Sequence, residues 1–343
     1  MPNLTLDSMA HGGEAVGRLD GKACFVAGAM PGEQVEIEIV KEKAHWARGR
    51  LVQILEASPD RIEPACPAFG VCGGCNWQYA PYERQLEWKR EVVAGQLKHL
   101  GGLAGIPVRP TIAPGPPYGY RNRMDFSVSN GRPALHRQRS DRLVALDGCP
   151  LLRPELAERF AALGDLSGTR KVVLRMGVNT GDVLILVDGR VPAAAKDWDA
   201  AVVAREHKSL RTVRGRAWFE EKIDDIRLRV PATAFFQVNT AGAEELVRLV
   251  TEAAAVTSDD VLLDGYAGVG LFAATVGRKA KRVVTIDSGR TEYRAISDNL
   301  ERALPRPFTS RLGSFEATAS AVCLLYTSPS PRDRTRSRMP SSA

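Results

Sequence analysis

The cysteines are the residues in this sequence whose type and spacing most clearly suggest chemistry. Six occur in 343 residues. Cys66, Cys72 and Cys75 form the pattern C-x₅-C-x₂-C, and Cys149 follows after 73 intervening residues. Thiolates this close in sequence can converge on one centre, and the Gly73–Gly74 pair gives the backbone freedom to wrap around it. In a reducing compartment, such a group is more often a metal site than a set of disulfides.

Two kinds of metal centre suit four cysteines. Structural zinc is usually held by two CxxC-like pairs, whereas this sequence offers one such pair and two single cysteines. The spacing therefore favours a 4Fe–4S cluster over zinc. Cys24 lies in a strand-like run and is expected in a core, and Cys323 is given no role.

A second chemical pattern is the stretch VLLDGYAGVGLF, in which an apolar strand leads into a glycine turn. Gly268 and Gly270 let the backbone approach a ligand at the start of the following helix. Asp287 ends the next apolar strand, 17 residues after Gly270, where a carboxylate can accept both ribose hydroxyls of a nucleoside cofactor. Asp264, four residues before Gly268, completes D-x-x-x-G-x-G, the pattern of class I S-adenosylmethionine methyltransferases. A dinucleotide site, with Ala273 as the third small residue, and an ordinary sheet turn are the alternatives.

The elements that must position these residues follow three patterns. Residues 1–58 alternate apolar and polar positions between glycines, which predicts a small antiparallel barrel. Apolar residues at helical spacing predict an amphipathic helix over 81–100, and strands dominate from 107 to 230. From about 231 helices and buried strands alternate, which predicts a parallel, doubly wound sheet.

Charge and hydropathy limit the possible partners and compartments. The net charge is +7, and six arginines lie between Tyr120 and Arg142 against two aspartates. Such a surplus can neutralise phosphates, although charge alone favours a solvated basic face. No apolar run approaches the ~20 residues that span a bilayer, and the N-terminus lacks the features of a secretory signal. A cytoplasmic protein without a membrane partner is expected.

The last residues differ in composition from the rest of the chain. LLYTSPSPRDRTRSRMPSSA is rich in Ser, Pro and Arg, has no periodicity and cannot bury a core. It resembles the peptide produced when sequencing-adapter DNA is read through. Residues 322–343 are therefore expected to be a foreign, disordered tail.

Taken together, these segments resemble the uracil-C5 RNA methyltransferase family. The resemblance rests on GGEAVGRLDGKACFVAGAMPGE, CPAFGVCGGCNWQYAPYERQLEWKRE, YRNRMDF, FFQVN and DGYAGVGLF, which occur in the order of the family. It implies a multidomain α/β protein that begins with a TRAM domain, an OB-like barrel, over 1–58. A central β-rich domain with the cluster follows over 59–230, and its helix 81–100 is expected to pack on the methyltransferase domain. An incomplete Rossmann-like methyltransferase domain is expected over 231–321.

The resemblance also implies roles for single residues. Gln237, Tyr266 and Asp287 would contact S-adenosylmethionine, with Gly268 and Gly270 shaping the pocket. The 4Fe–4S ligands would be Cys66, Cys72, Cys75 and Cys149, and Arg121 and Arg123 would bind RNA. Ala267 stands where many relatives have a cysteine, a change that we expect to be harmless. The TRAM-like barrel favours 23S ribosomal RNA over transfer RNA, and the expected state is a monomer.

The chemistry of the family needs a nucleophile and a base. Carbon 5 of uracil is a poor nucleophile, so a cysteine thiolate adds to carbon 6 before carbon 5 attacks the cofactor's methyl group, and a base then removes the C5 proton. The motifs Asp-Pro-Pro and Cys-Asp-Pro or Cys-Asn-Pro, which carry this machinery in the family, do not occur in the sequence. We therefore assign no catalytic residue and expect this chain to be inactive. The alternatives are a non-catalytic RNA-binding protein, a tRNA uracil-C5 methyltransferase and an iron–sulfur oxidoreductase.

Overall fold

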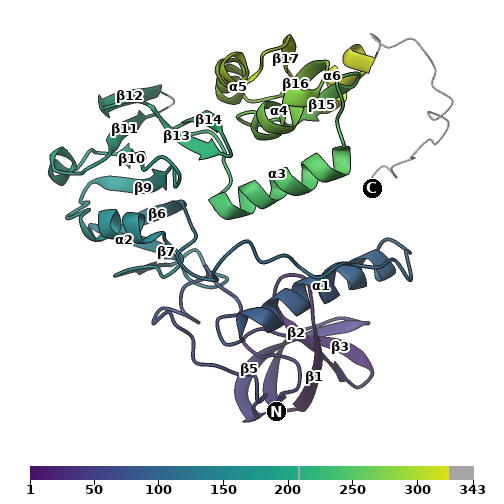
Figure 1. Cartoon of the computed structure of the whole chain (residues 1–343). Coiled ribbons are helices and arrows are strands. Elements are labelled where there is room, and N and C mark those ends of the chain that lie inside the picture. The colour runs from purple at the N-terminus through teal and green to yellow at the C-terminus, as the bar shows by residue number, and fades with distance from the viewer. Residues whose placement is uncertain (208, 324–343) are drawn as a thin grey trace. The chain divides into compact units, whose positions relative to one another are not determined.

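The computed structural model describes residues 1–207 and 209–323 and divides into two compact units (Figure 1). The first comprises Met1–Met176 and Val183–Arg216, and the second comprises Gly177–Asp182 and the chain from Ala217 onward. The second unit therefore begins before residue 231. Residues 1–58 do not form a unit of their own but belong to the same unit as the residues that follow them. The domain bounds drawn from the sequence stay predictions. Most of the predicted tail, 324–343, lies outside the described residues.

The first unit opens with the predicted barrel. Its strands are β1 (Asn3–Met9), β2 (Ala15–Leu19), β3 (Lys22–Val26), β4 (Gln34–Glu42) and β5 (Trp46–Glu56). They close in the order β1-β2-β3-β5-β4, and alternate residues point into a buried core. Gly49 makes room for the buried Ile37 side chain, because a Cβ there would lie 2.7 Å from it. The expected barrel is confirmed, but it is not wholly antiparallel as predicted, because β3 and β5 pair in parallel where the barrel closes.

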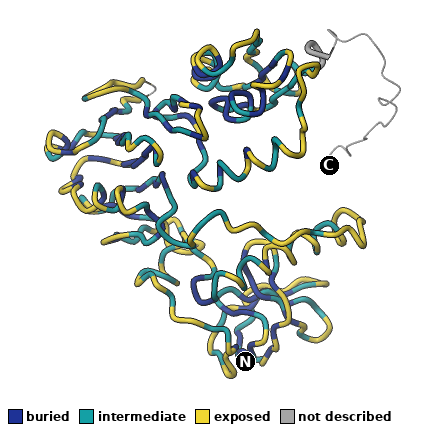
Figure 2. Tube along the Cα trace, viewed as in Figure 1, coloured by how far each residue is buried: buried dark blue, intermediate teal, exposed yellow. Residues whose placement is uncertain are grey.

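The cysteine-rich segment and the helix after it extend the barrel core. Tyr79, Ala80 and Trp88 belong to the same buried cluster as the barrel's inner residues, and the Tyr79 hydroxyl donates to the Ala29 carbonyl at 3.0 Å. Trp88 lies on α1 (Tyr82–His99), the helix predicted at 81–100. Figure 2 shows the buried positions inside the barrel. The helix therefore packs on the barrel through Trp88, and its packing on the methyltransferase domain stays a prediction.

A seven-stranded sheet forms the rest of the first unit, in the order β12-β11-β10-β9-β6-β7-β8. Its strands are β6 (Arg123–Ser129), β7 (Arg132–His136), β8 (Leu143–Ala145), β9 (Thr169–Met176), β10 (Val183–Gly189), β11 (Ala201–Glu206) and β12 (Ser209–Arg214). The helix α2 (Pro154–Ala161) and the short η1 (Ala193–Lys196) lie between strands in sequence. Phe160 of α2 packs against Phe126 of β6, with ring centroids 5.0 Å apart. This region is rich in strands, as predicted.

The second unit contains a parallel sheet with helices. After the hairpin β13 (Trp218–Ile223) and β14 (Ile226–Pro231) come α3 (Thr240–Ala254), β15 (Val261–Gly265), α4 (Leu271–Thr275), η2 (Val276–Lys279), β16 (Arg282–Asp287), α5 (Arg290–Ala303), β17 (Phe308–Leu312) and α6 (Phe315–Cys323). Strands β15, β16 and β17 pair in parallel. Because the carboxyl ends of parallel strands meet at one edge, the turns after them gather there. In the described part of the chain, no helix has the length and apolar character needed to cross a bilayer.

Candidate functional site

The predicted glycine turn lies at the carboxyl edge of this parallel sheet. It links β15 to α4, and its backbone is left-handed at Tyr266 (φ 59°), Gly268 (φ 57°) and Gly270 (φ 87°). A Cβ built on Gly268 would meet no atom within 4 Å, so the space beside it is open. Since glycine adopts this conformation without a steric penalty, the turn can present bare backbone to a ligand. Tyr266 adopts it at a cost and exposes 67% of its surface.

Asp287 lies beside this turn, as the sequence predicted. Its Oδ2 accepts the Gly268 amide at 2.8 Å, and its Oδ1 accepts the Gly289 amide at 2.8 Å. Its own carbonyl accepts the Gly313 amide at 2.9 Å, which connects it to the turn after β17. Asp287 therefore joins the turns that follow all three parallel strands, the first two through its carboxylate and the third through its backbone carbonyl.

Asp264, the acid of the D-x-x-x-G-x-G pattern, holds the two ends of the turn together by a hydrogen bond. Its Oδ2 accepts the Ala273 amide at 3.0 Å, which ties β15 to the first turns of α4. Burial, together with the nearby charge of Asp287, raises the pKa of Asp264 to about 6. The hydrogen bond from Ala273 opposes this rise but does not cancel it.

Tyr266, which was predicted to contact the cofactor, forms an aromatic pair beside the turn with Phe315, a residue that the sequence did not single out. The ring of Tyr266 stacks on Phe315, with centroids 5.4 Å apart, and its hydroxyl donates to Glu316 Oε1 at 2.6 Å. Gly265 makes room for this pair, since a Cβ there would lie 2.6 Å from the Phe315 ring. Phe315 follows β17, and tracing the third parallel strand to its carboxyl end would have found it.

Gln237 and Asn239 lie in the segment between β14 and α3. Asn239 is the N-cap of α3, where its side chain accepts the Gly242 amide at 3.1 Å. Gln237 is half-buried and has partners within the protein. Its contact with the cofactor stays a prediction.

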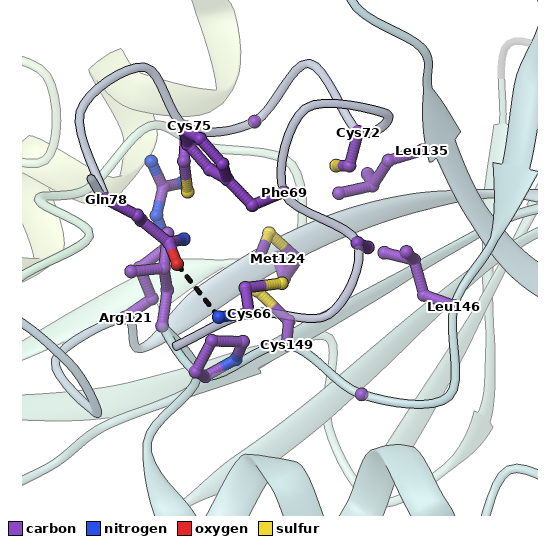
Figure 3. A pocket seen from close by; sticks show the side chains of 15 residues that line it. Cys66, Phe69, Cys72, Cys75, Gln78, Arg121, Met124, Leu135, Leu146 and Cys149 are labelled. Carbon is purple, nitrogen blue, oxygen red and sulfur yellow. Dashed lines mark hydrogen bonds between the residues drawn. The ribbon is translucent and has the colours of Figure 1, made fainter. Parts of the chain in front are cut away.

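The four predicted ligand cysteines line one cavity of about 180 Å³ in the first unit. Figure 3 shows their side chains around it, together with Arg121, Gln78 and apolar groups. Cys149 comes from the segment between β8 and α2, so the fold unites it with the other three across the sequence. Burial raises the pKa of the Cys75 and Cys149 thiols. Among the described residues, no group of three or more His, Cys, Asp or Glu side chains is gathered closely enough to hold a metal ion.

The cavity nevertheless fits a group that binds thiolates. Its lining combines four thiols with apolar side chains such as Phe69, Leu135 and Leu146. The Arg121 Nε atom is buried without a hydrogen-bond partner among the described residues, and this arginine lines the cavity. A cation with an unused donor suits an anionic thiolate-bound group. Arg121 was predicted to bind RNA, and the structure places it at the cysteines.

Arg123, the second predicted RNA ligand, is already paired. It donates to both carboxylate oxygens of Asp125 at 2.7 and 3.1 Å, and Lys171 adds a contact at 2.8 Å. Burial would raise the pKa of Asp125, but these hydrogen bonds outweigh it and lower the pKa to about 2. A phosphate would have to compete with Asp125 for Arg123, and RNA binding by this residue stays a prediction.

Comparison with known proteins agrees with this arrangement. Residues 4–52 match the TRAM domain. An RNA methyltransferase of Gloeobacter violaceus is 36% identical over 327 residues, which span 83% of this chain and 72% of that protein. The 23S rRNA (uracil(1939)-C(5))-methyltransferase RlmD of Photorhabdus laumondii is 30% identical and is covered over 74% of its length, with 87% of this chain matched.

Among solved structures, the tRNA (uracil-54, C5)-methyltransferase of Pyrococcus abyssi, in complex with S-adenosyl-L-homocysteine, shares the fold. Its TM-score is 0.68 at 22% identity, and the match covers 90% of this chain and 79% of that one. The barrel, the parallel sheet with its glycine turn and the extent of these matches lead to one assignment. The chain belongs to the family of TRAM-containing RNA uracil-C5 methyltransferases.

Proposed function

We propose that the chain serves the S-adenosylmethionine-dependent methylation of uridine C5 in RNA, with 23S ribosomal RNA as the favoured substrate. The observation that carries the proposal is the turn at Gly268, open on one side and bound by Asp287 at the carboxyl edge of a parallel sheet. The 30% identity to a 23S rRNA enzyme supports ribosomal RNA over transfer RNA. A reducing cytoplasm is the proposed compartment, and a monomer the proposed state.

Several groups around the turn suit S-adenosylmethionine. Asp287 has lone pairs left to accept the ribose hydroxyls, and Gly268 lets the cofactor approach the backbone. Tyr266 and Gln237 are the further proposed contacts, and Gly270 fixes the turn where α4 begins. When bound, the cofactor supplies an electrophilic methyl group on its sulfonium.

The target uridine must leave its stack before C5 can meet that methyl group. We assign neither the nucleophile nor the base to a described residue.

We further propose that Cys66, Cys72, Cys75 and Cys149 hold a 4Fe–4S cluster in the cavity of Figure 3. The role proposed for the cluster is structural. The cysteine segment contacts the barrel directly, since the Trp77 indole donates to the Gly13 carbonyl at 3.1 Å. A cluster that fixes this segment would also fix its contact with the barrel.

Equilibrium titration with S-adenosylhomocysteine tests the proposed cofactor site. The wild-type chain should bind one equivalent, and Asp287→Ala should weaken binding by about tenfold or more, since a hydrogen bond to a charged group contributes ~1.5–3 kcal/mol. Asp259→Ala, an exposed acid outside the turn, is the matched control and should bind like the wild type. Equal affinity of Asp287→Ala and wild type would refute the site.

A further inference from the structure

We propose that an outer face of the barrel stacks an unpaired RNA base on Trp46 and holds the neighbouring phosphate with Lys41. The face comprises Arg18, Phe25, Lys41, Trp46 and Arg48, and we call it the aromatic face. The inference rests on the proposed function, because it needs an RNA substrate. It specifies which face of the barrel would bind that RNA, and that the bound stretch would be unpaired.

Strand register places these five side chains on one side of the barrel. Adjacent residues in register are Arg18 with Ala23, Ala23 with Trp46, Phe25 with Arg48 and Arg48 with Lys41. Residues paired across strands point to the same side of a sheet. The residues between them, Cys24 and Ala47, are buried in the barrel core. The five therefore point outward, from four different strands.

The aromatic pair on this face is ordered but not buried. Phe25 and Trp46 are both half-buried, and their rings meet edge to face at 6.3 Å with an interplanar angle of 80°. Such a contact restrains an indole without enclosing it. An ordered, partly exposed indole is the kind of platform on which a single-stranded base stacks.

Cations gather on this indole. The Lys41 Nζ lies 5.6 Å and the Arg48 Cζ lies 5.7 Å from the centroid of the Trp46 ring. Arg48 is held by Glu14 at 2.9 Å, and Glu14 also accepts Arg139 at 2.6 Å. Lys41 is exposed and forms no ion pair within the described residues. Lys41 is therefore free to leave the ring when a base arrives and to meet the phosphate attached to it.

The charge of the face favours nucleic acid over an apolar protein partner. Lys41 and Arg48 lie against the Trp46 ring, and Arg18 adds a third cation to the same face. Glu14 is buried and paired with two arginines. The bases of a duplex stack on one another and offer no free π-face within the helix. A single-stranded stretch offers both a base and a phosphate, so unpaired RNA is the occupant that fits.

Fluorescence anisotropy with labelled oligouridine, which has little structure of its own, tests the proposal on the full chain. Trp46→Leu should weaken binding about tenfold, because stacking contributes this order of affinity per base. Trp46→Phe should retain most of the affinity. Leu55→Ala removes an exposed apolar side chain from the same strand and should bind like the wild type. Affinity for duplex RNA should not change in Trp46→Leu.

Three outcomes would overturn the proposal: equal oligouridine affinity of Trp46→Leu and wild type, an equal loss for duplex RNA, or no binding of oligouridine by the wild type. If Trp46→Leu fails to fold, Lys41→Ala decides, since an exposed lysine is not needed for folding. Lys41→Ala should reduce the slope of log affinity against log salt concentration by about one phosphate contact. An unchanged slope would refute the proposal. The proposed function is judged separately by S-adenosylhomocysteine titration, which these barrel variants should leave unaltered.

Discussion

Arg121 brings a positive charge to a cavity lined by four thiols. Its buried Nε has no hydrogen-bond partner among the described residues, and its charge lowers the pKa of the Cys75 thiol against the larger effect of burial. The sequence showed the four cysteines by type and spacing alone. It could not show that this arginine faces them, because adjacency to Cys75 depends on how the segment between residues 75 and 121 folds.

Replacing Arg121 should alter a cluster bound in this cavity. Arg121→Gln removes the charge, so the reduction potential of the reconstituted cluster should become more negative, since an anionic cluster then gains an electron less easily. Arg121→Lys should restore much of the wild-type value. Anaerobic potentiometry measures the shift, and Arg123→Gln, whose side chain is paired with Asp125, is the control. An identical potential in Arg121→Gln would contradict this role, and a colourless, iron-free protein would contradict the cluster.

Asp264 makes stability depend on pH. Its pKa is raised to about 6 in the folded chain from 3.8, so the folded state keeps a proton that the unfolded chain loses first. The free energy of unfolding should therefore fall by about 3 kcal/mol between about pH 4 and pH 6 through this group.

Asp264→Asn keeps an oxygen for the Ala273 amide and removes this titration. Relative to the wild type, the variant should gain stability as the pH rises from 4 to 7. Urea unfolding at pH 4.5 and pH 7.5 measures the difference, with Asp259→Asn as the exposed control. A constant difference between Asp264→Asn and wild type across this range would show that the carboxyl is not shifted.

At the scale of elements, the cofactor turn depends on a buried side chain of α5. Asn299 is fully buried, and its Nδ2 donates to the Val269 carbonyl at 2.8 Å, between the two glycines. The same side chain accepts the Arg229 amide at 2.8 Å and donates to the Arg229 carbonyl at 3.1 Å. It therefore links the turn to β14.

Asn299→Ala should loosen that link. It leaves buried backbone groups without partners, each at a cost of about 1–3 kcal/mol, so the second unit should lose stability and bind S-adenosylhomocysteine more weakly. Calorimetry would measure both effects, and Glu301→Ala, exposed on the same helix, should change stability by less than about 0.5 kcal/mol. Wild-type stability and affinity in Asn299→Ala would rule out the positioning role.

The sequence predicted the secondary-structure elements better than the contacts between them. Period-two alternation gave the barrel, and buried strands alternating with helices gave the parallel sheet, because both patterns are local. Those contacts bring together residues that are far apart in the sequence. Val178 and Asn179, in the loop between β9 and β10, donate their amides to Glu221 at 2.9 and 3.0 Å, which assigns that loop to the second unit. No periodicity in the sequence signals that contact.

At the scale of the whole molecule, the three proposed sites are divided between the two units. The cysteine cavity and the aromatic face belong to the first, and the turn around Gly268 and Asp287 belongs to the second. The family assignment depends on both units, because the TRAM match covers only residues 4–52 while the relatives span most of the chain.

The central claim is that the second unit holds S-adenosylmethionine and not a dinucleotide. Calorimetric titration of the same chain with S-adenosylmethionine and with NADH tests it most directly. Both ligands carry an adenosine whose ribose hydroxyls could donate hydrogen bonds to Asp287. We predict one equivalent of S-adenosylmethionine bound and no saturable binding of NADH. Binding of NADH alone would contradict the account.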